Sequence, residues 1–316
     1  MTERVEEGSA LLGRIVQCRT QDGLKLDGFL QRVGDQPRRQ AAGDGSFQTP
    51  LETLWILVHG VASNFYGSRL LQCCAEYFVG AGCDAVRVNT RGHDAMAFFS
   101  NGLSVIQAGA AYESIGDSVK DLNAWVQWGR GLGYRRIGIL GHSLGAVKTV
   151  FSLAQSMEPF SQVQQLVLLS PPRFSPSLFR ADPRGTRYTS AMVQATEAVE
   201  GGEPEKLMRV SYPFPMLISA RAYREKYGEP AKYDYLPLAS SLPIPTLWCF
   251  GSQEVRSGKG SFRDADQHWQ NLGLPSIHSL EVIEGGDHNY TEVLPELLQC
   301  IDRWRAGTGR YDSLAD

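Results

Sequence analysis

Residues 135–150 read RRIGILGHSLGAVKTV, and the pattern changes character within this stretch. Ile137–Leu140 is an apolar run of strand length, whereas apolar residues from Leu144 onward recur at helical spacing. The intervening GHSLG fits G-x-S-x-G at a strand-to-helix junction, a sharp turn that lifts the serine above a sheet and crowds both glycines. The pattern therefore predicts an elbow centred on Ser143, with the Leu144 N–H at the helix N-terminus facing any oxyanion formed there.

The pattern G-x-S-x-G is short enough to arise by chance in a chain of this length. A glycine-rich loop with an exposed serine is therefore the alternative interpretation. The strand before Gly141 and the helix after Gly145 favour the elbow. Partner residues elsewhere in the chain have to decide between the two interpretations.

The composition is that of a globular protein with a sizeable core. The 316 residues are 42% hydrophobic and 21% charged, and the formal net charge of -3 provides no electrostatic reason to bind nucleic acid or an anionic membrane. Apolar runs stay shorter than the roughly 18 residues of a membrane span, and the N-terminal MTERVEEGSA is too acidic and polar for a secretory signal. The six cysteines form no C-x-x-C pair, so we expect reduced thiols and a cytoplasmic protein.

Neither a metal nor an organic cofactor is expected. No cysteine and histidine lie at metal-ligand spacing, and H-E-x-x-H does not occur. The glycines at 129, 131 and 133 precede a strand, whereas a dinucleotide-binding loop follows one.

Buried strands and helices alternate along most of the chain. A helix is expected from Ser68 to Gly80 and another over Tyr112–Gly129, whereas Ala95–Ala111 reads as irregular. Strands are expected at residues 14–20, 24–33, 54–58, 83–89, 137–140, 165–170, 246–250 and 279–283. This alternation predicts an α/β fold, a mostly parallel twisted sheet with helices on both faces.

Residues 171–243 break the alternation. They are rich in Pro, Arg, Tyr and Met, contain helix-like pieces at Ala191–Ala198 and Leu217–Lys226, and have no apolar run typical of a buried strand. We interpret residues 171–243 as a helical cap inserted over the carboxyl edge of the sheet. The core domain then consists of residues 1–170 and 244–316.

Three chemically suitable residues follow expected strands. Ser143 follows the first of them, Glu254 lies in GSQE after residues 246–250, and His288 lies in GGDHN after residues 279–283. Because the carboxyl ends of parallel strands meet at one edge of a sheet, these side chains are expected to converge. Their order along the chain is serine, acid, histidine.

Five motifs together carry a family resemblance. They are LVHGVASN (57–64), NTRGHD (89–94), LGHSLGA (140–146), FGSQE (250–254) and GGDHN (285–289). On these motifs the chain resembles the α/β-hydrolase-fold serine hydrolases of the carboxylesterase and lipase type over about residues 14–305. The resemblance implies Ser143 as nucleophile, His288 as base and a carboxylate after the penultimate strand as the third member.

The acid and the oxyanion hole follow from the same resemblance. Glu254 occupies a position that more often holds Asp in this family, and Asp287 is the nearest rival in sequence. Adjacent residues on an extended loop tend to point apart, which favours Glu254 over Asp287 as the partner of His288. The resemblance also implies that the backbone N–H groups of Val61 and Leu144 form the oxyanion hole.

Three further residues are candidates for the substrate site. His59 precedes Gly60, and we interpret its main role as fixing the oxyanion loop. Phe98 and Phe99 are candidates for lining a pocket, with ordinary core packing as the alternative.

The function expected from this pattern is hydrolysis of a carboxylic ester of a small molecule through an acyl-enzyme on Ser143. A thioesterase, an acyltransferase or a C–C bond hydrolase would use the same residues. A non-catalytic ligand-binding scaffold is the alternative from a different class, and the complete serine–acid–histidine set argues against it.

Overall fold

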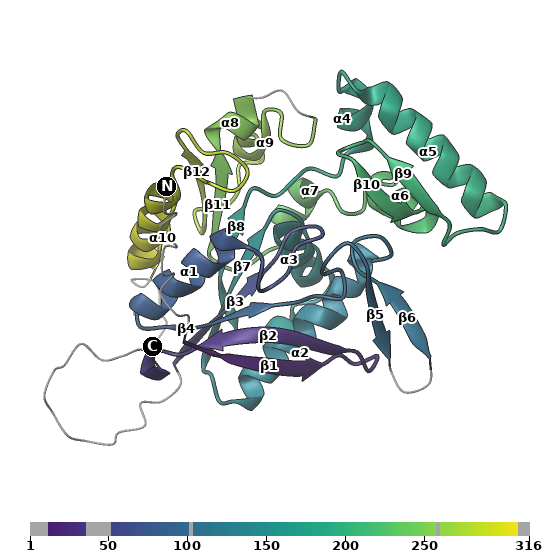
Figure 1. Cartoon of the computed structure of the whole chain (residues 1–316). Coiled ribbons are helices and arrows are strands. Elements are labelled where there is room, and N and C mark those ends of the chain that lie inside the picture. The colour runs from purple at the N-terminus through teal and green to yellow at the C-terminus, as the bar shows by residue number, and fades with distance from the viewer. Residues whose placement is uncertain (1–11, 36–51, 101–103, 257–259, 309–316) are drawn as a thin grey trace, which may run out of the picture.

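A single large sheet organises the molecule (Figure 1). The computed structural model describes residues 12–35, 52–100, 104–256 and 260–308, so the polar N-terminal segment lies outside the described residues. The sheet has eight strands in the order β1-β2-β4-β3-β7-β8-β11-β12. They are β1 (Arg14–Arg19), β2 (Lys25–Gln31), β3 (Thr53–Val58), β4 (Asp84–Val88), β7 (Arg136–His142), β8 (Val163–Leu169), β11 (Thr246–Gly251) and β12 (His278–Ile283).

The predicted mostly parallel sheet is confirmed. β1 pairs antiparallel with β2, and β2 pairs antiparallel with β4, whereas all pairings from β4 to β12 are parallel. β3 lies between β4 and β7, and its residues Leu54–Val58 are completely buried, as expected for an apolar strand covered on both faces.

Helices cover both faces of the sheet because successive side chains of a strand point in opposite directions. Trp55 and Leu57 of β3 belong to the apolar cluster that also contains residues of α1 (Arg69–Gly80) and α10 (Leu294–Thr308). Leu54 and Ile56 belong to the other cluster, which contains residues of α2 (Ser118–Gly131) and α3 (Leu144–Gln155).

Two elements near α2 differ from the sequence-based expectation. α2 begins at Ser118 and not near Tyr112, because residues 112–117 form a turn and the short 3₁₀ helix η2 (Ile115–Asp117). The segment expected to be irregular contains an antiparallel hairpin of β5 (Ala97–Ser100) and β6 (Val105–Ala108). Strands of only four residues carry too little periodicity to be recognised.

Residues 171–243 lie between β8 and β11 in the chain. They form α4 (Pro176–Ala181), α5 (Gly185–Glu200), β9 (Leu207–Val210), β10 (Met216–Ser219), α6 (Ala220–Tyr227) and α7 (Tyr235–Ala239). The expected helices are present, but the expectation of no buried strand is wrong. β9 and β10 pair antiparallel and bury Met208, Val210 and Ile218. Leu217, which fits a helical pattern, belongs to β10 because the short hairpin precedes α6.

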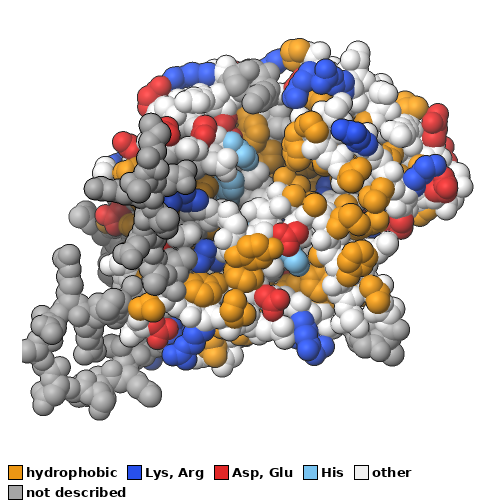
Figure 2. Space-filling model, viewed as in Figure 1, with side chains coloured by type: hydrophobic (Ala, Val, Ile, Leu, Met, Phe, Trp, Pro, Cys, Tyr) orange, Lys and Arg blue, Asp and Glu red, His pale blue; other side chains and the backbone are white. Residues whose placement is uncertain are grey.

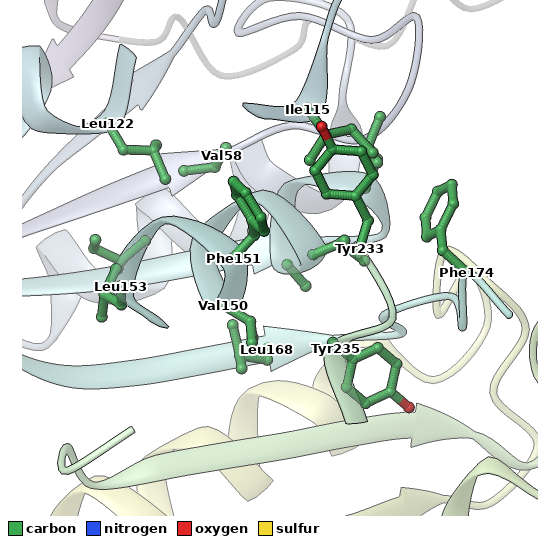
Figure 3. Packing of buried hydrophobic residues seen from close by; sticks show 14 of the residues in the cluster. Val58, Ile115, Leu122, Val150, Phe151, Leu153, Leu168, Phe174, Tyr233 and Tyr235 are labelled. Atoms are coloured by element: carbon green, nitrogen blue, oxygen red, sulfur yellow. The ribbon is translucent and has the colours of Figure 1, made fainter. Parts of the chain in front are cut away.

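The apolar side chains of residues 171–243 share one cluster with α2 and α3. Figure 3 shows Val150 and Phe151 of α3 near Leu168 of β8, with Tyr233 and Tyr235 lying beside them. The Phe151 and Tyr233 rings meet edge to face, with their centroids 4.9 Å apart. Residues 171–243 are thus packed directly on α3, the helix that follows Ser143.

The remaining short helices are η1 (Val33–Asp35), η3 (Glu158–Phe160), α8 (Ser252–Arg256) and α9 (Ala265–Gln270). Among the described residues, no helix is both long enough and apolar enough to cross a lipid bilayer. All six cysteines lie in the described part of the chain and are unpaired thiols.

Candidate active site

Ser143 occupies the turn between β7 and α3. Its backbone has φ 54° and ψ -123°, an unfavourable conformation for a residue with a side chain that is typical of strained functional turns. The Ser143 N–H donates to the Leu169 carbonyl at 2.8 Å, which ties the turn to β8. Gly145 is required by close packing, because a Cβ there would lie 2.3 Å from the Val58 carbonyl oxygen. The sequence therefore forms the predicted elbow.

His288 connects Ser143 to Glu254. The Nε2 atom of His288 lies 3.0 Å from Ser143 Oγ, and its Nδ1 lies 2.5 Å from Glu254 Oε1. The His288 side chain is 38% exposed, whereas the Glu254 side chain is only 5% exposed. The three residues therefore form one hydrogen-bonded chain that runs from a buried carboxylate to a hydroxyl group at the surface of the site.

Glu254 is held by a second set of contacts that the sequence did not indicate. Its Oε2 accepts a hydrogen bond from Ser170 Oγ at 2.5 Å and another from the Gly251 N–H at 3.1 Å. Ser170 Oγ also lies 2.9 Å from the Tyr290 hydroxyl. These contacts leave Oε1 directed at His288. The position of Ser170, directly after β8, is the only sequence signal for this role.

Among the described residues, Asp287 makes no hydrogen bond to the imidazole ring of its neighbour His288. Its Oδ1 accepts from the N–H groups of Asn289 and Thr291, and its Oδ2 accepts from Thr291 Oγ1. The hydrogen bonds of this carboxylate therefore stabilise the loop after β12.

Val61 and Leu144 line the same cavity as Ser143. Leu144 is the first residue of α3, so its N–H has no partner within the helix. Among the described residues, neither this N–H nor that of Val61 donates a hydrogen bond. Both groups are therefore available to an oxyanion next to Ser143.

His59 lies behind the loop and not in the cavity. It is completely buried, its Nδ1–H donates to the Gly60 carbonyl at 2.7 Å, and its Nε2 accepts from the Thr90 N–H. Burial, with a smaller contribution from the Lys148 charge, lowers the pKa of His59 to about 3, so the ring is neutral at pH 7. The assignment of His59 to substrate binding is thus corrected, and its contacts are those of a residue that fixes the loop.

The hydrogen bond from His59 to the Gly60 carbonyl orients the backbone N–H of Val61. The Gly60–Val61 peptide is trans, so its carbonyl and N–H point in opposite directions. Because His59 binds the carbonyl, the Val61 N–H points away from His59.

A cavity of about 1010 Å³ opens beside Ser143 and His288. Figure 2 shows histidine next to hydrophobic side chains on this face of the molecule. Six Phe and Tyr side chains belong to the lining, from residues 171–243, from the segment before α9 and from the loop after β12: Phe174, Tyr212, Phe214, Tyr227, Phe262 and Tyr290. Such a lining is typical of a small-molecule site.

Phe98 and Phe99 do not line this cavity. Phe98 lies on β5 and is 62% exposed, and Phe99 packs edge to face against His93. Their assignment to the substrate site is corrected, because neither ring belongs to the wall of the cavity that holds Ser143 and His288; the β5–β6 hairpin is labelled in Figure 1. Within the described residues, no three His, Cys, Asp or Glu side chains converge to form a metal site.

Comparison with known proteins yields structural relatives only. No protein-family model and no curated protein sequence matches the chain. Est1E from Butyrivibrio proteoclasticus, solved with ferulic acid, superimposes with a TM-score of 0.64 at 15% identity, covering 92% of this chain and 98% of Est1E. The Pyrococcus furiosus esterase Pf2001 has a TM-score of 0.59 at 18% identity, with 92% and 90% covered. The α/β hydrolase GrgF from Penicillium sp. sh18 has a TM-score of 0.61 at 17% identity, with 93% and 98% covered.

The chain has the α/β-hydrolase fold. Within this fold, Ser143, Glu254 and His288 follow β7, β11 and β12 at the carboxyl edge of the sheet. This is the edge at which open α/β sheets bind ligands.

Proposed function

We propose that the protein hydrolyses carboxylic esters of small molecules through an acyl-enzyme formed on Ser143. The observation that carries this proposal is the hydrogen-bonded chain from Glu254 through His288 to Ser143, which ends beside an aromatic cavity. One of the similar solved structures, Pf2001, is an esterase, and another, Est1E, was solved with ferulic acid bound, which favours ester hydrolysis among the reactions of this fold.

In the first half of the reaction, Ser143 Oγ attacks the ester carbonyl carbon while His288 Nε2 takes the hydroxyl proton. Glu254 stabilises the resulting imidazolium and keeps Nδ1 protonated. The tetrahedral oxyanion accepts hydrogen bonds from the Val61 and Leu144 N–H groups. When the intermediate collapses, the C–O bond to the alcohol breaks and His288 protonates the leaving alcohol.

In the second half, a water molecule takes the place of the alcohol. His288 removes one proton from the water, the hydroxide attacks the acyl carbon, and the same amides bind the second oxyanion. Collapse returns the proton to Ser143 Oγ and releases the carboxylic acid. Substrate and water are the only reactants that this cycle needs.

We further propose that residues 171–243 act as a cap that selects the substrate. Four of the six Phe and Tyr side chains of the lining belong to this segment. Flat apolar groups stack well on aromatic rings, so an aromatic or other apolar acyl group is the best fit to the cavity. The ferulic acid bound to Est1E is an aromatic acid, which is consistent with this choice.

The direct test uses purified protein with p-nitrophenyl acetate and with a fluorophosphonate probe. We expect a burst of p-nitrophenol and covalent labelling of Ser143, identified by peptide mass spectrometry. Parallel assays with acyl thioesters and with alcohol acceptors distinguish a thioesterase or an acyltransferase. A protein that neither turns over esters nor reacts with the probe would be a binding scaffold, and the proposal would be wrong.

A further inference from the structure

Three ionisable side chains meet in the interior behind the oxyanion loop. Glu113, Lys148 of α3 and Lys226 of α6 are all buried. Lys148 Nζ lies 2.6 Å from Glu113 Oε2, and Lys226 Nζ lies 3.0 Å from Glu113 Oε1. Gly92 makes room for this carboxylate, because a Cβ at residue 92 would lie 1.6 Å from Glu113 Oε2.

Stability alone does not account for this cluster. Removing ions from water is unfavourable, and buried ion pairs replaced by apolar residues often leave a protein equally stable. Burial favours the neutral acid, but the two lysine charges outweigh it and hold the pKa of Glu113 below its ordinary value, so the carboxylate is ionised. Glu113 is thus the shared ion-pair partner of both lysine side chains.

This cluster is connected by hydrogen bonds to the loop after β3, residues 59–61, which we call the oxyanion loop. Lys148 Nζ donates to Thr90 Oγ1 at 3.0 Å, and Thr90 Oγ1 lies 3.3 Å from His59 Nε2. The lysine occupies a lone pair of the hydroxyl oxygen, and His59 Nε2, which also accepts from the Thr90 N–H, is the shared acceptor for the hydroxyl proton. His59 Nδ1–H in turn donates to the Gly60 carbonyl at 2.7 Å.

We propose that Lys148 and Thr90 are positioning residues that act through His59 to orient and polarise the Gly60–Val61 peptide. Donors in such a chain strengthen one another, and a hydrogen bond to a peptide carbonyl makes the N–H of the same peptide a better donor. The Val61 N–H would thereby bind an oxyanion more strongly. This inference rests on the proposed ester hydrolysis. It adds a hydrogen-bond chain that stabilises the transition state of that reaction.

Residues 171–243 take part in the same network through Lys226. Lys226 Nζ also donates to the Ala110 carbonyl at 3.0 Å, which fixes α6 to the loop that carries Glu113. A displacement of α6 would move Lys226 away from Glu113. The ion pair between Glu113 and Lys148 would then become stronger. The position of α6 relative to Glu113 therefore affects the hydrogen bonds of the oxyanion loop, although Lys226 itself does not line the cavity.

The test compares Thr90→Val, which keeps the side-chain shape but removes the hydroxyl, with Thr90→Ser, which keeps the hydroxyl. We expect Thr90→Val to lower kcat for p-nitrophenyl acetate about tenfold, because loss of a whole oxyanion donor costs roughly 100-fold or more. KM is expected to stay within twofold of the wild-type value. Thr90→Ser should keep at least half of the wild-type kcat.

A trifluoromethyl ketone provides a second readout, because it forms an oxyanion on the serine. Its inhibition constant for Thr90→Val should rise by the same factor by which kcat/KM falls. The acidic limb of the pH profile should not move, since His288 and Glu254 are untouched. An unchanged kcat, or a loss that appears in KM or in the acidic limb, would overturn the proposal. If Thr90→Val does not fold, Lys148→Met is judged by the same criteria.

The link to residues 171–243 is tested with Lys226→Met against Tyr188→Phe. Tyr188 donates its hydroxyl to the Tyr227 carbonyl, so its loss weakens the same segment without touching the network. We expect kcat to fall several-fold in Lys226→Met and to stay at the wild-type value in Tyr188→Phe. Equal kcat values in the two variants would show that α6 has no such influence.

Failure of this inference is distinguishable from failure of the proposed function. If wild-type protein hydrolyses the ester and Ser143→Ala does not, the reaction stands and the Thr90 variants judge the network alone. If wild-type protein is inactive and does not bind the trifluoromethyl ketone, the proposed function itself is wrong.

Discussion

Ser143 is the residue on which the proposed chemistry depends most directly, and Ser143→Ala removes its nucleophilic oxygen while leaving the strained turn in place. We expect ester turnover to fall by several orders of magnitude, since comparable knock-outs cost about 10⁶ in kcat. The melting temperature should remain within a few degrees of wild type, as measured by circular dichroism. Activity equal to that of the wild type would place the nucleophile at another residue.

Glu254 and Asp287 are both near His288, but their contacts differ. Glu254 lies against Nδ1 of the ring, whereas Asp287 accepts from the loop amides. Replacing a triad carboxylate by its amide has cost about 10⁴ in kcat in a comparable enzyme. We therefore expect Glu254→Gln to lose two to four orders of magnitude and Asp287→Asn no more than about tenfold. Steady-state kinetics at saturating substrate measure both, and the opposite ranking would assign the acid to Asp287.

At the scale of elements, residues 171–243 contain one set of aromatic residues in the cavity and another in the interior. Phe214 lines the cavity and is 40% exposed, whereas Tyr223 is completely buried beside Tyr227. We expect Phe214→Ala to change the preference among acyl groups with little loss of stability. Tyr223→Ala should instead destabilise the protein by about 3–5 kcal/mol, the range for large aromatic truncations in a core.

Two measurements on the Phe214→Ala and Tyr223→Ala variants test this prediction. Kinetics with a panel of p-nitrophenyl esters give the acyl preference, and urea unfolding gives the stability. The prediction fails if Phe214→Ala leaves the acyl preference unchanged while Tyr223→Ala alters it without a loss of stability. Residues 171–243 would then not select the substrate through the cavity wall.

The β1–β2 hairpin is tied to the rest of the sheet by an ion pair. Asp22, in the hairpin turn, accepts from Arg91 at 2.9 Å. Partial burial alone would raise the pKa of Asp22, but hydrogen bonds from Arg91 and Thr20 hold it well below its ordinary value. The folded state thus prefers the ionised carboxyl, so this stabilisation is present above the unfolded pKa of about 3.9 and is lost as the pH falls below it.

We expect Asp22→Asn to be less stable than the wild type at pH 6 by about 1 kcal/mol, since the group is partly exposed and screened. The difference should shrink toward zero as the pH falls from 4 to 2. Urea unfolding at pH 6, 4 and 2.5 measures it. Asp35→Asn, which removes a longer ion pair with Arg14 at 3.5 Å, is the matched control and should show a smaller effect. A constant difference at all three pH values would mean that the Asp22 charge does not stabilise the hairpin.

At the scale of the whole molecule, one apolar cluster joins α2 and α3 to residues 171–243. A shared core makes a single cooperative transition the expected behaviour. We predict that the slowest amides of α6 and α3 exchange with the same free energy of opening under EX2 conditions. Hydrogen exchange with mass spectrometry at increasing urea measures this, and exchange of α6 at lower urea than α3 would indicate a separately unfolding cap.

Local sequence patterns were sufficient to predict the mostly parallel sheet and the elbow at Ser143. The buried run in β3, the glycines around Ser143 and the strand-end positions of Glu254 and His288 are all visible in the sequence, because each reflects a short-range requirement of backbone and burial. The convergence of Ser143, Glu254 and His288 then follows from the rule that open α/β sheets collect reactive groups at their carboxyl edge.

Contacts between distant segments could only come from the tertiary structure. Aromatic residues occur throughout the chain, so nothing local distinguishes Phe98, which lies outside the cavity, from Phe262, which lines it. The bond from Ser170 to Glu254 joins residues 84 positions apart, and Lys226 reaches Glu113 across 113 positions. Sequence periodicity reports which face of an element is buried but not which other element covers it. For that physical reason the support of Glu254, the cavity wall and the buried lysine network were decided by the packing of the folded chain.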